Sequence, residues 1–140
     1  MPQIQLGATL QTGRFIASAR EQHLVADATT QRGGPGEGWA AAELLLAALG
    51  TCAAAVVQAQ ARESGGIETL PLRIHIHSEP DPGDSRRYAF ISLEFLVPAA
   101  HVRQARKWIR TFQQTCPIYN TLAQGTHLRV RISSTRAQIQ

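Results

Sequence analysis

The sequence predicts an α+β fold with antiparallel strand pairing, and two kinds of pattern support this class. Several short segments alternate apolar and polar residues with a period of two, as half-buried strands do. Two other segments have helical patterns, and one of them is a long run of alanine and leucine. The 140 residues are 44% hydrophobic and 17% charged, which predicts a single domain over residues 1–140 and excludes a disordered chain.

The first half of the chain predicts short strands, a loop and a long helix. Residues 3–28 contain several short extended segments in which apolar side chains alternate with polar or small ones. Residues 29–38 contain four glycines and a proline, a composition typical of a loop. Residues 39–64 form the predicted long helix, whose central part carries alanine and leucine on every face. A helix that is apolar all round is a buried helix, so we expect other elements to enclose it.

Two alternating segments further on predict an antiparallel β-hairpin. Residues 70–78 place leucine and isoleucine on one face, and His75 and His77 on the other. The segment EPDPGDS has the composition of a turn, and residues 86–97 then alternate again.

The last third predicts two helices and a strand. Residues 99–114 form an amphipathic helix with arginines facing outward, and its apolar stripe consists of Val102, Ala105, Ile109 and Phe112. A short helix is expected between Pro117 and Gly125, and residues 127–132 alternate as the last strand.

The charge is divided unevenly along the chain. Residues 1–94 carry seven basic and all ten acidic side chains, whereas residues 95–140 carry seven basic and no acidic ones. Such a basic segment can complement an acidic surface across a subunit interface, or bind nucleic acid. We favour an interface or plain solvation, because the aromatic residues do not alternate with the arginines as a stacking platform requires.

We expect a cytoplasmic protein. The first residues lack the basic and apolar segments of a secretory leader. The apolar run from Trp39 to Val57 is interrupted by Glu43 and is too short and too weakly apolar for a membrane span. Cytoplasmic thiols are kept reduced, so Cys52 and Cys116 indicate either inert packing or redox chemistry.

The two cysteines have different local settings. Cys52 lies in the long helix two residues after Gly50, and a glycine there suggests close approach by another backbone or a ligand. Cys116 precedes Pro117, and because proline is favoured at the first helical position, Cys116 is the predicted N-cap of the short helix. The N–H groups and dipole at a helix start lower the pKa of a thiol, so on local physics Cys116 is the better thiolate. Cys52 needs an external cation.

The segment GPGEGWAAAELLLAALGTC, followed far downstream by CPIYNTLAQG, resembles the OsmC/Ohr family. This family comprises osmotically inducible protein C and the organic hydroperoxide resistance protein, and the resemblance is strongest to the shorter, OsmC-like branch. It covers most of the chain. It implies an OsmC-like fold with antiparallel sheets around a long buried central helix, in an intertwined homodimer.

The same resemblance implies a cysteine-based thiol peroxidase that reduces organic hydroperoxides. Such an enzyme is an antioxidant of the oxidative stress response and uses no metal, haem or flavin cofactor. Cys52 would attack the distal peroxide oxygen and become a sulfenic acid, with release of an alcohol. Cys116 would then condense with it to a disulfide. An external dithiol would restore both thiols, and the resemblance suggests a lipoyl-type reductant.

An arginine beside the first sulfur would hold it as a thiolate and orient the peroxide. The osmotically inducible type carries this arginine 20 residues before the reactive cysteine, a position that matches Arg32. The hydroperoxide resistance type draws it from the N-terminal strands, which matches Arg14, and we rank Arg32 first.

The chain departs from the family pattern at one acidic position. Many characterised members carry a glutamate ten residues before the cysteine, where this chain has Ala42. Glu43 lies nine residues before Cys52, which places it on the opposite face of a regular helix. Glu43 could reach an arginine of the partner subunit, or simply stabilise the start of the helix.

Two other functions are weighed against the peroxidase. The missing glutamate motivates a protein of the same fold that binds a small apolar ligand, and the basic last third motivates a protein that associates with nucleic acid, which we rank lowest. His75 and His77 have a spacing that can ligate a metal, but no third ligand is apparent, so we expect no metal site.

Overall fold

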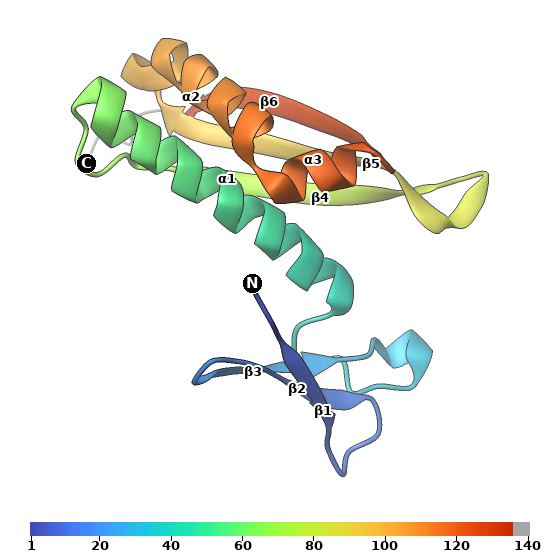
Figure 1. The fold of residues 1–140 in the computed structure, drawn as a ribbon. Helices are drawn as coiled ribbons and strands as arrows, with labels where there is room; N and C mark the ends of the chain where they lie inside the picture. Colours follow the sequence, from blue (N-terminus) through green and yellow to red (C-terminus); the bar gives the residue numbers. More distant parts are fainter. Residues whose placement is uncertain (136–140) are drawn as a thin grey trace. The chain divides into compact units, whose positions relative to one another are not determined.

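The computed structural model describes residues 1–135, and the chain forms two compact units that divide after Leu45. The first unit contains an antiparallel sheet with the strand order β1-β2-β3 (Figure 1). Its strands are β1 (Gln5–Ala8), β2 (Arg14–Ala19) and β3 (Gln22–Asp27). The predicted loop that follows contains a short 3-10 helix, η1 (Thr30–Arg32).

The sheet of the first unit has one apolar face. The register pairs Leu6 with Ala17 and Ala17 with Leu24, and pairs Phe15 with Ala26, so these side chains share a face. Leu6 is 58% exposed and Leu24 is 37% exposed in the single chain. Apolar surface of this kind, gathered on one face, is typical of an interaction surface.

The long predicted helix is present as α1 (Ala41–Gly65), which ends where Gly66 takes a positive φ of 65°. Its fully buried residues are Leu49, Ala53, Val57 and Ala61, four residues apart, so one chain buries one stripe of the helix. The expectation that this helix is enclosed on all sides is therefore not met within one chain.

Contrary to the expectation from the run Trp39 to Val57, the helix α1 is long and apolar enough to cross a membrane by length and composition alone, with a mean hydropathy of 1.7 over an 18-residue window. This is weak evidence for a span, because the core helix of a soluble protein passes the same test.

The second unit contains a sheet with the order β4-β5-β6. β4 (Arg73–Asp81) and β5 (Asp84–Pro98) pair antiparallel, which confirms the predicted hairpin. The strands extend further than the sequence pattern indicates, so the turn between them is shorter than predicted. The inward side chains of β5 are buried, namely Ile91, Leu93, Phe95 and Val97.

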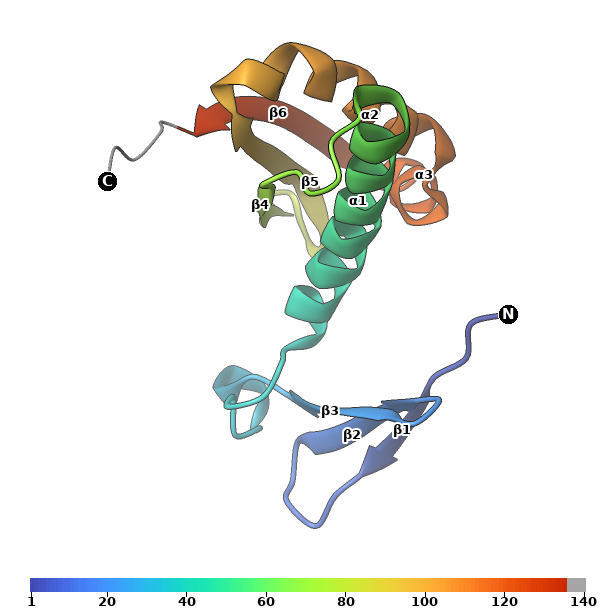
Figure 2. The same ribbon diagram turned by 90° about the vertical axis from the view of Figure 1, so that its left-hand side faces the viewer.

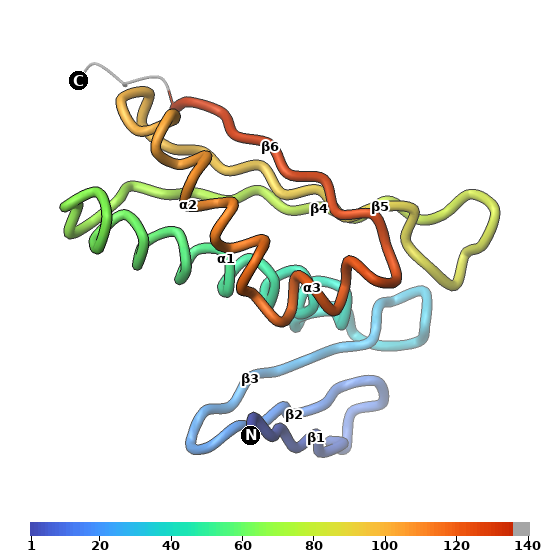
Figure 3. The backbone as a smooth tube through the Cα atoms, turned by 45° about the horizontal axis from the view of Figure 1, so that its top comes forward, coloured from blue at the N-terminus to red at the C-terminus, as the bar shows by residue number. Residues whose placement is uncertain are grey.

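The last strand, β6 (His127–Thr135), runs parallel to β5, which corrects the expectation of purely antiparallel sheets. Parallel neighbours need a long crossover connection, and the chain supplies one through η2 (Ala99–His101), α2 (Val102–Thr115) and α3 (Pro117–Ala123). Figure 3 traces this path from β5 to β6.

The helices of the second unit pack on one face of its sheet (Figure 2). The buried stripe of α2 is Ala105, Trp108, Ile109 and Phe112, so Trp108 replaces the predicted Val102, which is only partly buried. Trp108 donates a hydrogen bond from Nε1 to Ser64 Oγ of α1 at 3.0 Å. This contact joins the crossover to the end of the long helix.

Candidate redox site

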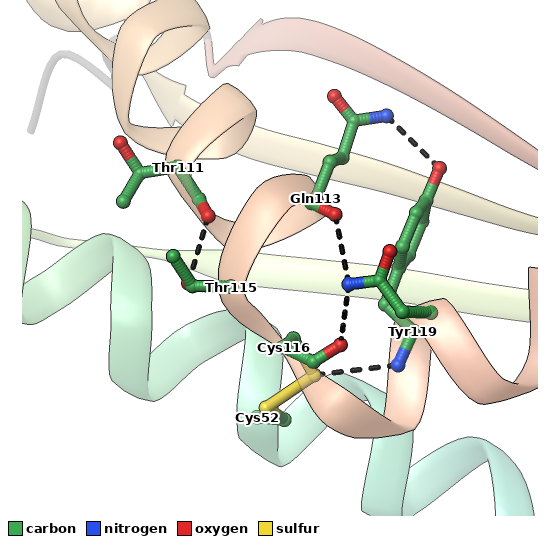
Figure 4. Close-up of a disulfide and its surroundings, with 7 residues drawn as sticks. Cys52, Thr111, Gln113, Thr115, Cys116 and Tyr119 are labelled. Carbon is green, nitrogen blue, oxygen red and sulfur yellow. Dashed lines mark hydrogen bonds between the residues drawn. A yellow bond between two sulfur atoms is a disulfide. The ribbon is translucent and has the colours of Figure 1, made fainter.

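The second unit brings the two cysteines together. Cys52 of α1 and Cys116, at the junction of α2 and α3, form a disulfide with a Cα–Cα distance of 6.7 Å across a sequence separation of 64 (Figure 4). Because the separation is so large, only the packing of the crossover against α1 places the sulfurs side by side. The pair can therefore cycle between two thiols and a disulfide.

Cys116 is the N-cap of α3, as predicted from the proline that follows it. Its Sγ accepts a hydrogen bond from the backbone N–H of Tyr119 at 3.4 Å. The Tyr119 hydroxyl accepts a hydrogen bond from Gln113 Nε2 at 3.1 Å, and its ring packs edge-on against Phe112. Tyr119 is thus a direct neighbour of the site, and the N–H group stabilises negative charge on the Cys116 sulfur when the disulfide opens.

The side chain of Asn120 holds the backbone of Cys116 by a further hydrogen bond. Asn120 Nδ2 donates to the carbonyl oxygen of Cys116 at 2.8 Å and to that of Gln113 at 3.1 Å. This contact could not be predicted from the sequence, because an asparagine in a short helix is ordinarily solvent-facing. The amide holds the link between α2 and α3 and with it the position of the sulfur.

The two sulfurs differ in exposure. Cys116 is 1% exposed and belongs to the hydrophobic core, whereas Cys52 is partly exposed and packs at the margin of that core. Among the hydrogen bonds of residues 1–135, the one from Tyr119 is the only one that reaches either sulfur. Cys52 therefore has the greater solvent access, and Cys116 has the hydrogen bond that stabilises its sulfur.

Gly50 allows close packing on the same stretch of α1. A Cβ atom at this position would lie 2.5 Å from Cδ1 of Ile76 on β4. The neighbour is thus a side chain, and not the backbone or ligand that the sequence suggested. Gly50 lets the sheet approach the helix two residues before Cys52.

Arg14, Arg32 and Glu43 all belong to the first unit, where each has local contacts of its own. The guanidinium of Arg14 binds Asp27 through two hydrogen bonds of 2.9 and 2.8 Å and binds Glu37 at 2.8 Å. The roles of Asp27 and Glu37 could not be predicted from the sequence, because contacts between distant residues do not show in residue spacing. This network gives Arg14 a structural role.

Asp27 binds the glycine-rich loop in addition to Arg14. Its side chain is fully buried, and its Oδ2 accepts the backbone N–H groups of Glu37 at 2.9 Å and Gly38 at 2.6 Å. The side-chain hydrogen bonds from Arg14, together with these N–H groups, hold the pKa of Asp27 well below its usual range. The carboxylate is therefore charged throughout the physiological pH range.

Arg32 and Glu43 differ from Arg14 in how far they are engaged. Arg32 is exposed in η1, and within the described part of the chain its guanidinium makes no hydrogen bond or ion pair. Glu43 Oε2 accepts the backbone N–H of Ala40 at 2.9 Å. Glu43 thus satisfies one of the unpaired donors at the start of α1, as the glutamate of a capping box does.

The face of the second sheet that points away from the helices is polar. His75 pairs with Glu94 in the register, and Arg129 lies over the ring of Phe90 at 3.6 Å. Over residues 1–135, no group of three or more His, Cys, Asp or Glu side chains is arranged to hold a metal ion.

Comparison with known proteins places this geometry in a family. The sequence model described as "OsmC-like protein" matches residues 34–131, which include both cysteines. The chain belongs to this family of OsmC-like proteins. No curated protein matches it.

Solved structures share the fold at low sequence identity. An OsmC-like protein from Mycoplasma pneumoniae superposes with a TM-score of 0.75 at 18% identity, covering 96% of this chain and 98% of that one. An organic hydroperoxide resistance protein OsmC from Legionella pneumophila gives 0.69 at 12% identity, covering 95% and 96%. An OsmC-like protein of unknown function from Vibrio cholerae gives 0.75 at 12%, covering 95% and 99%. At these identities the likeness establishes the fold alone.

Proposed function

We propose that this protein is a thiol peroxidase that reduces organic hydroperoxides in the cytoplasm. The observation that carries the proposal is the juxtaposition of Cys52 and Cys116 from distant parts of the chain. Family membership suggests a redox role connected with peroxide, and one structural relative is described as an organic hydroperoxide resistance protein.

The proposed reaction has three steps. The Cys52 thiolate attacks the distal oxygen of the hydroperoxide, the O–O bond breaks, and an alcohol leaves after protonation. The Cys116 thiolate attacks the sulfur of the resulting sulfenic acid, the S–O bond breaks as the disulfide forms, and the departing hydroxide takes up a proton to become water. An external dithiol, which we propose is of the lipoyl type, reduces the disulfide and is itself oxidised. No metal or organic cofactor takes part in these steps.

Arg32 is our first choice for the arginine that stabilises the Cys52 thiolate. Its guanidinium is free of partners in the described part of the chain, whereas Arg14 is already held by Asp27 and Glu37. Glu43 is the weaker candidate for orienting an arginine, because its carboxylate is engaged by the start of α1.

We further propose a homodimer. One chain leaves the apolar face of the first sheet exposed, and it buries only one stripe of the apolar helix α1. A second copy would cover these surfaces, and because Leu6 and Leu24 are only partly exposed, the burial of each would contribute less than the roughly 1.5–3 kcal/mol of a fully exposed leucine. The molecular mass in solution, from sedimentation or light scattering, tests this part.

The peroxidase proposal is tested by intact mass under non-reducing conditions, before and after one equivalent of an organic hydroperoxide. The reduced wild type should lose two hydrogens, Cys116→Ser should retain an added oxygen or its overoxidised products, and Cys52→Ser should not react. If neither thiol of the wild type responds, the enzyme proposal fails and the chain is better understood as a binding protein of this fold.

The role of Arg32 is tested by the rate at which iodoacetamide alkylates Cys52 in the Cys116→Ser background. Arg32→Ala should slow alkylation near neutral pH by about tenfold, because less thiolate is present. Arg32→Lys keeps the charge and is the matched control. If Arg32→Ala leaves the rate of Cys52 alkylation unchanged, Arg32 does not stabilise the thiolate and another cation has to do so.

A further inference from the structure

We infer that the external reductant enters the disulfide at Cys52 and that Cys116 is the leaving thiolate. This inference rests on the proposed function, since it concerns the reductive half of the same cycle. The two sulfurs of a disulfide are chemically equivalent in isolation, so any preference between them has to come from the protein.

Access favours attack at Cys52. Thiol–disulfide exchange requires the incoming thiolate to reach the sulfur that it attacks. Cys52 is partly exposed at the margin of the core, whereas Cys116 is 1% exposed and lies within it. A nucleophile aimed at Cys116 would have to displace core side chains before it could form a bond.

The same preference holds with the proposed second copy in place. Thr51 and Ala55 are exposed residues of α1 beside the site, and Ala53 is buried in the core of the second unit. At about 100° per residue, Cys52 lies on the flank between these two stripes. A partner that covers the exposed stripe thus leaves the flank at the edge of its interface.

The hydrogen bonds within the second unit favour departure of Cys116. A disulfide breaks faster when the sulfur that leaves is the better stabilised thiolate. The N–H of Tyr119 already points at the Cys116 sulfur, and Asn120 fixes the backbone of that residue through its carbonyl oxygen. The described hydrogen bonds include none to the Cys52 sulfur.

Reduction of the disulfide takes two exchange steps. One thiolate of an external dithiol forms a bond to Cys52 Sγ, the bond between the cysteines breaks, and its electron pair leaves on Cys116 Sγ. The second thiol of the dithiol then attacks the mixed disulfide, releases the Cys52 thiolate, and leaves the reductant as a cyclic or linear disulfide. Two electrons pass from the dithiol to the protein, and the two thiolates take up the dithiol's two protons.

Glutathione, a monothiol, can stop the reaction at the mixed disulfide. The full-length protein is oxidised with diamide, freed of oxidant, treated briefly with limiting glutathione and quenched with N-ethylmaleimide. Trypsin separates the cysteines into the peptides 33–62 and 111–129, because each follows and ends with an arginine. Mass spectrometry then locates glutathione and N-ethylmaleimide on the two peptides.

We expect at least about ten glutathione adducts on Cys52 for each one on Cys116, with N-ethylmaleimide on Cys116. In guanidinium chloride, which removes the fold, the ratio should fall towards unity. Equal labelling of the native protein, or glutathione on Cys116, would overturn the inference. No peroxide is used, so a protein that fails as a peroxidase can still give a clear result here.

A pair of variants separates the N–H group from access. Tyr119→Ala keeps the backbone N–H, whereas Tyr119→Pro removes it, and both lose the same aromatic ring. The native preference for Cys52 should be smaller in Tyr119→Pro than in Tyr119→Ala. If the ratio of glutathione on Cys52 to glutathione on Cys116 is identical in the two folded variants, the hydrogen bond makes no contribution to the preference. If Tyr119→Pro does not fold, the ratio in the wild type still tests the inference.

Discussion

Reduction of the disulfide should lower the free energy of unfolding substantially. The bond closes a loop with a sequence separation of 64. Loop closure of this length removes conformational entropy from the unfolded chain worth about 4 kcal/mol at 25 °C. With a denaturant slope of about 2 kcal/mol/M in urea, the midpoint of unfolding should fall by about 2 M on reduction.

The assay compares oxidised and reduced wild type, because a Cys116→Ala variant would also leave a cavity in the core. Unfolding in urea is followed by circular dichroism at a fixed protein concentration, with and without a phosphine reductant. The Cys52→Ala/Cys116→Ala double variant should be insensitive to the reductant. Midpoints for the oxidised and reduced wild type that agree within about 0.2 M would refute the reasoning, because loop closure would then make no net contribution.

Three further outcomes follow from contacts outside the disulfide. Gly50→Val should destabilise the fold by roughly 1–3 kcal/mol in urea unfolding, because its side chain meets Ile76, and adding Ile76→Ala should recover part of the loss. Glu43→Ala should cost about 0.5–1 kcal/mol of stability by the same measurement, whereas Glu43→Gln should keep the cap. A loss of peroxide turnover in Glu43→Gln without a loss of stability would point instead to a role for the charge of Glu43. Arg14 lowers the pKa of Asp27, so the contribution of this carboxylate to stability is complete above the unfolded pKa of about 4 and is lost as the pH falls below that value. The urea midpoint of Asp27→Asn should therefore change less between pH 5 and pH 2 than the urea midpoint of the wild type.

The sequence predicted those elements whose residues carry their own signal. The hairpin follows from strict alternation, and the N-cap at Cys116 follows from the neighbouring proline. Both features depend on residues that are close together in the chain, and for such residues the sequence spacing determines which side chains share a face or meet.

Features that depend on distant residues were missed. The parallel direction of β6 is set by the crossover, and a period of two is the same in parallel and antiparallel strands. Trp108 interrupts the expected stripe of α2 because its indole reaches Ser64. The Arg14–Asp27 pair joins two strands and could not be found from either strand alone.

Two different arguments predict which cysteine is the reactive one. Local physics singled out Cys116, and the family resemblance singled out Cys52 as the attacking residue. The structure joins the two residues, and it gives Cys116 the N–H group and Cys52 the solvent access.

The parallel crossover also orders events during synthesis of the chain. The helix α1 and the hairpin β4–β5 leave the ribosome first, and their contacts are available before Cys116 has been translated. Cys52 then has no partner until α2 and α3 dock and bring Cys116 beside it. Contacts between segments so far apart form late in folding, because the intervening chain must first be closed into a loop. Formation of the native disulfide during oxidative refolding in vitro therefore reports that the crossover has docked on α1, and its yield over time follows that step.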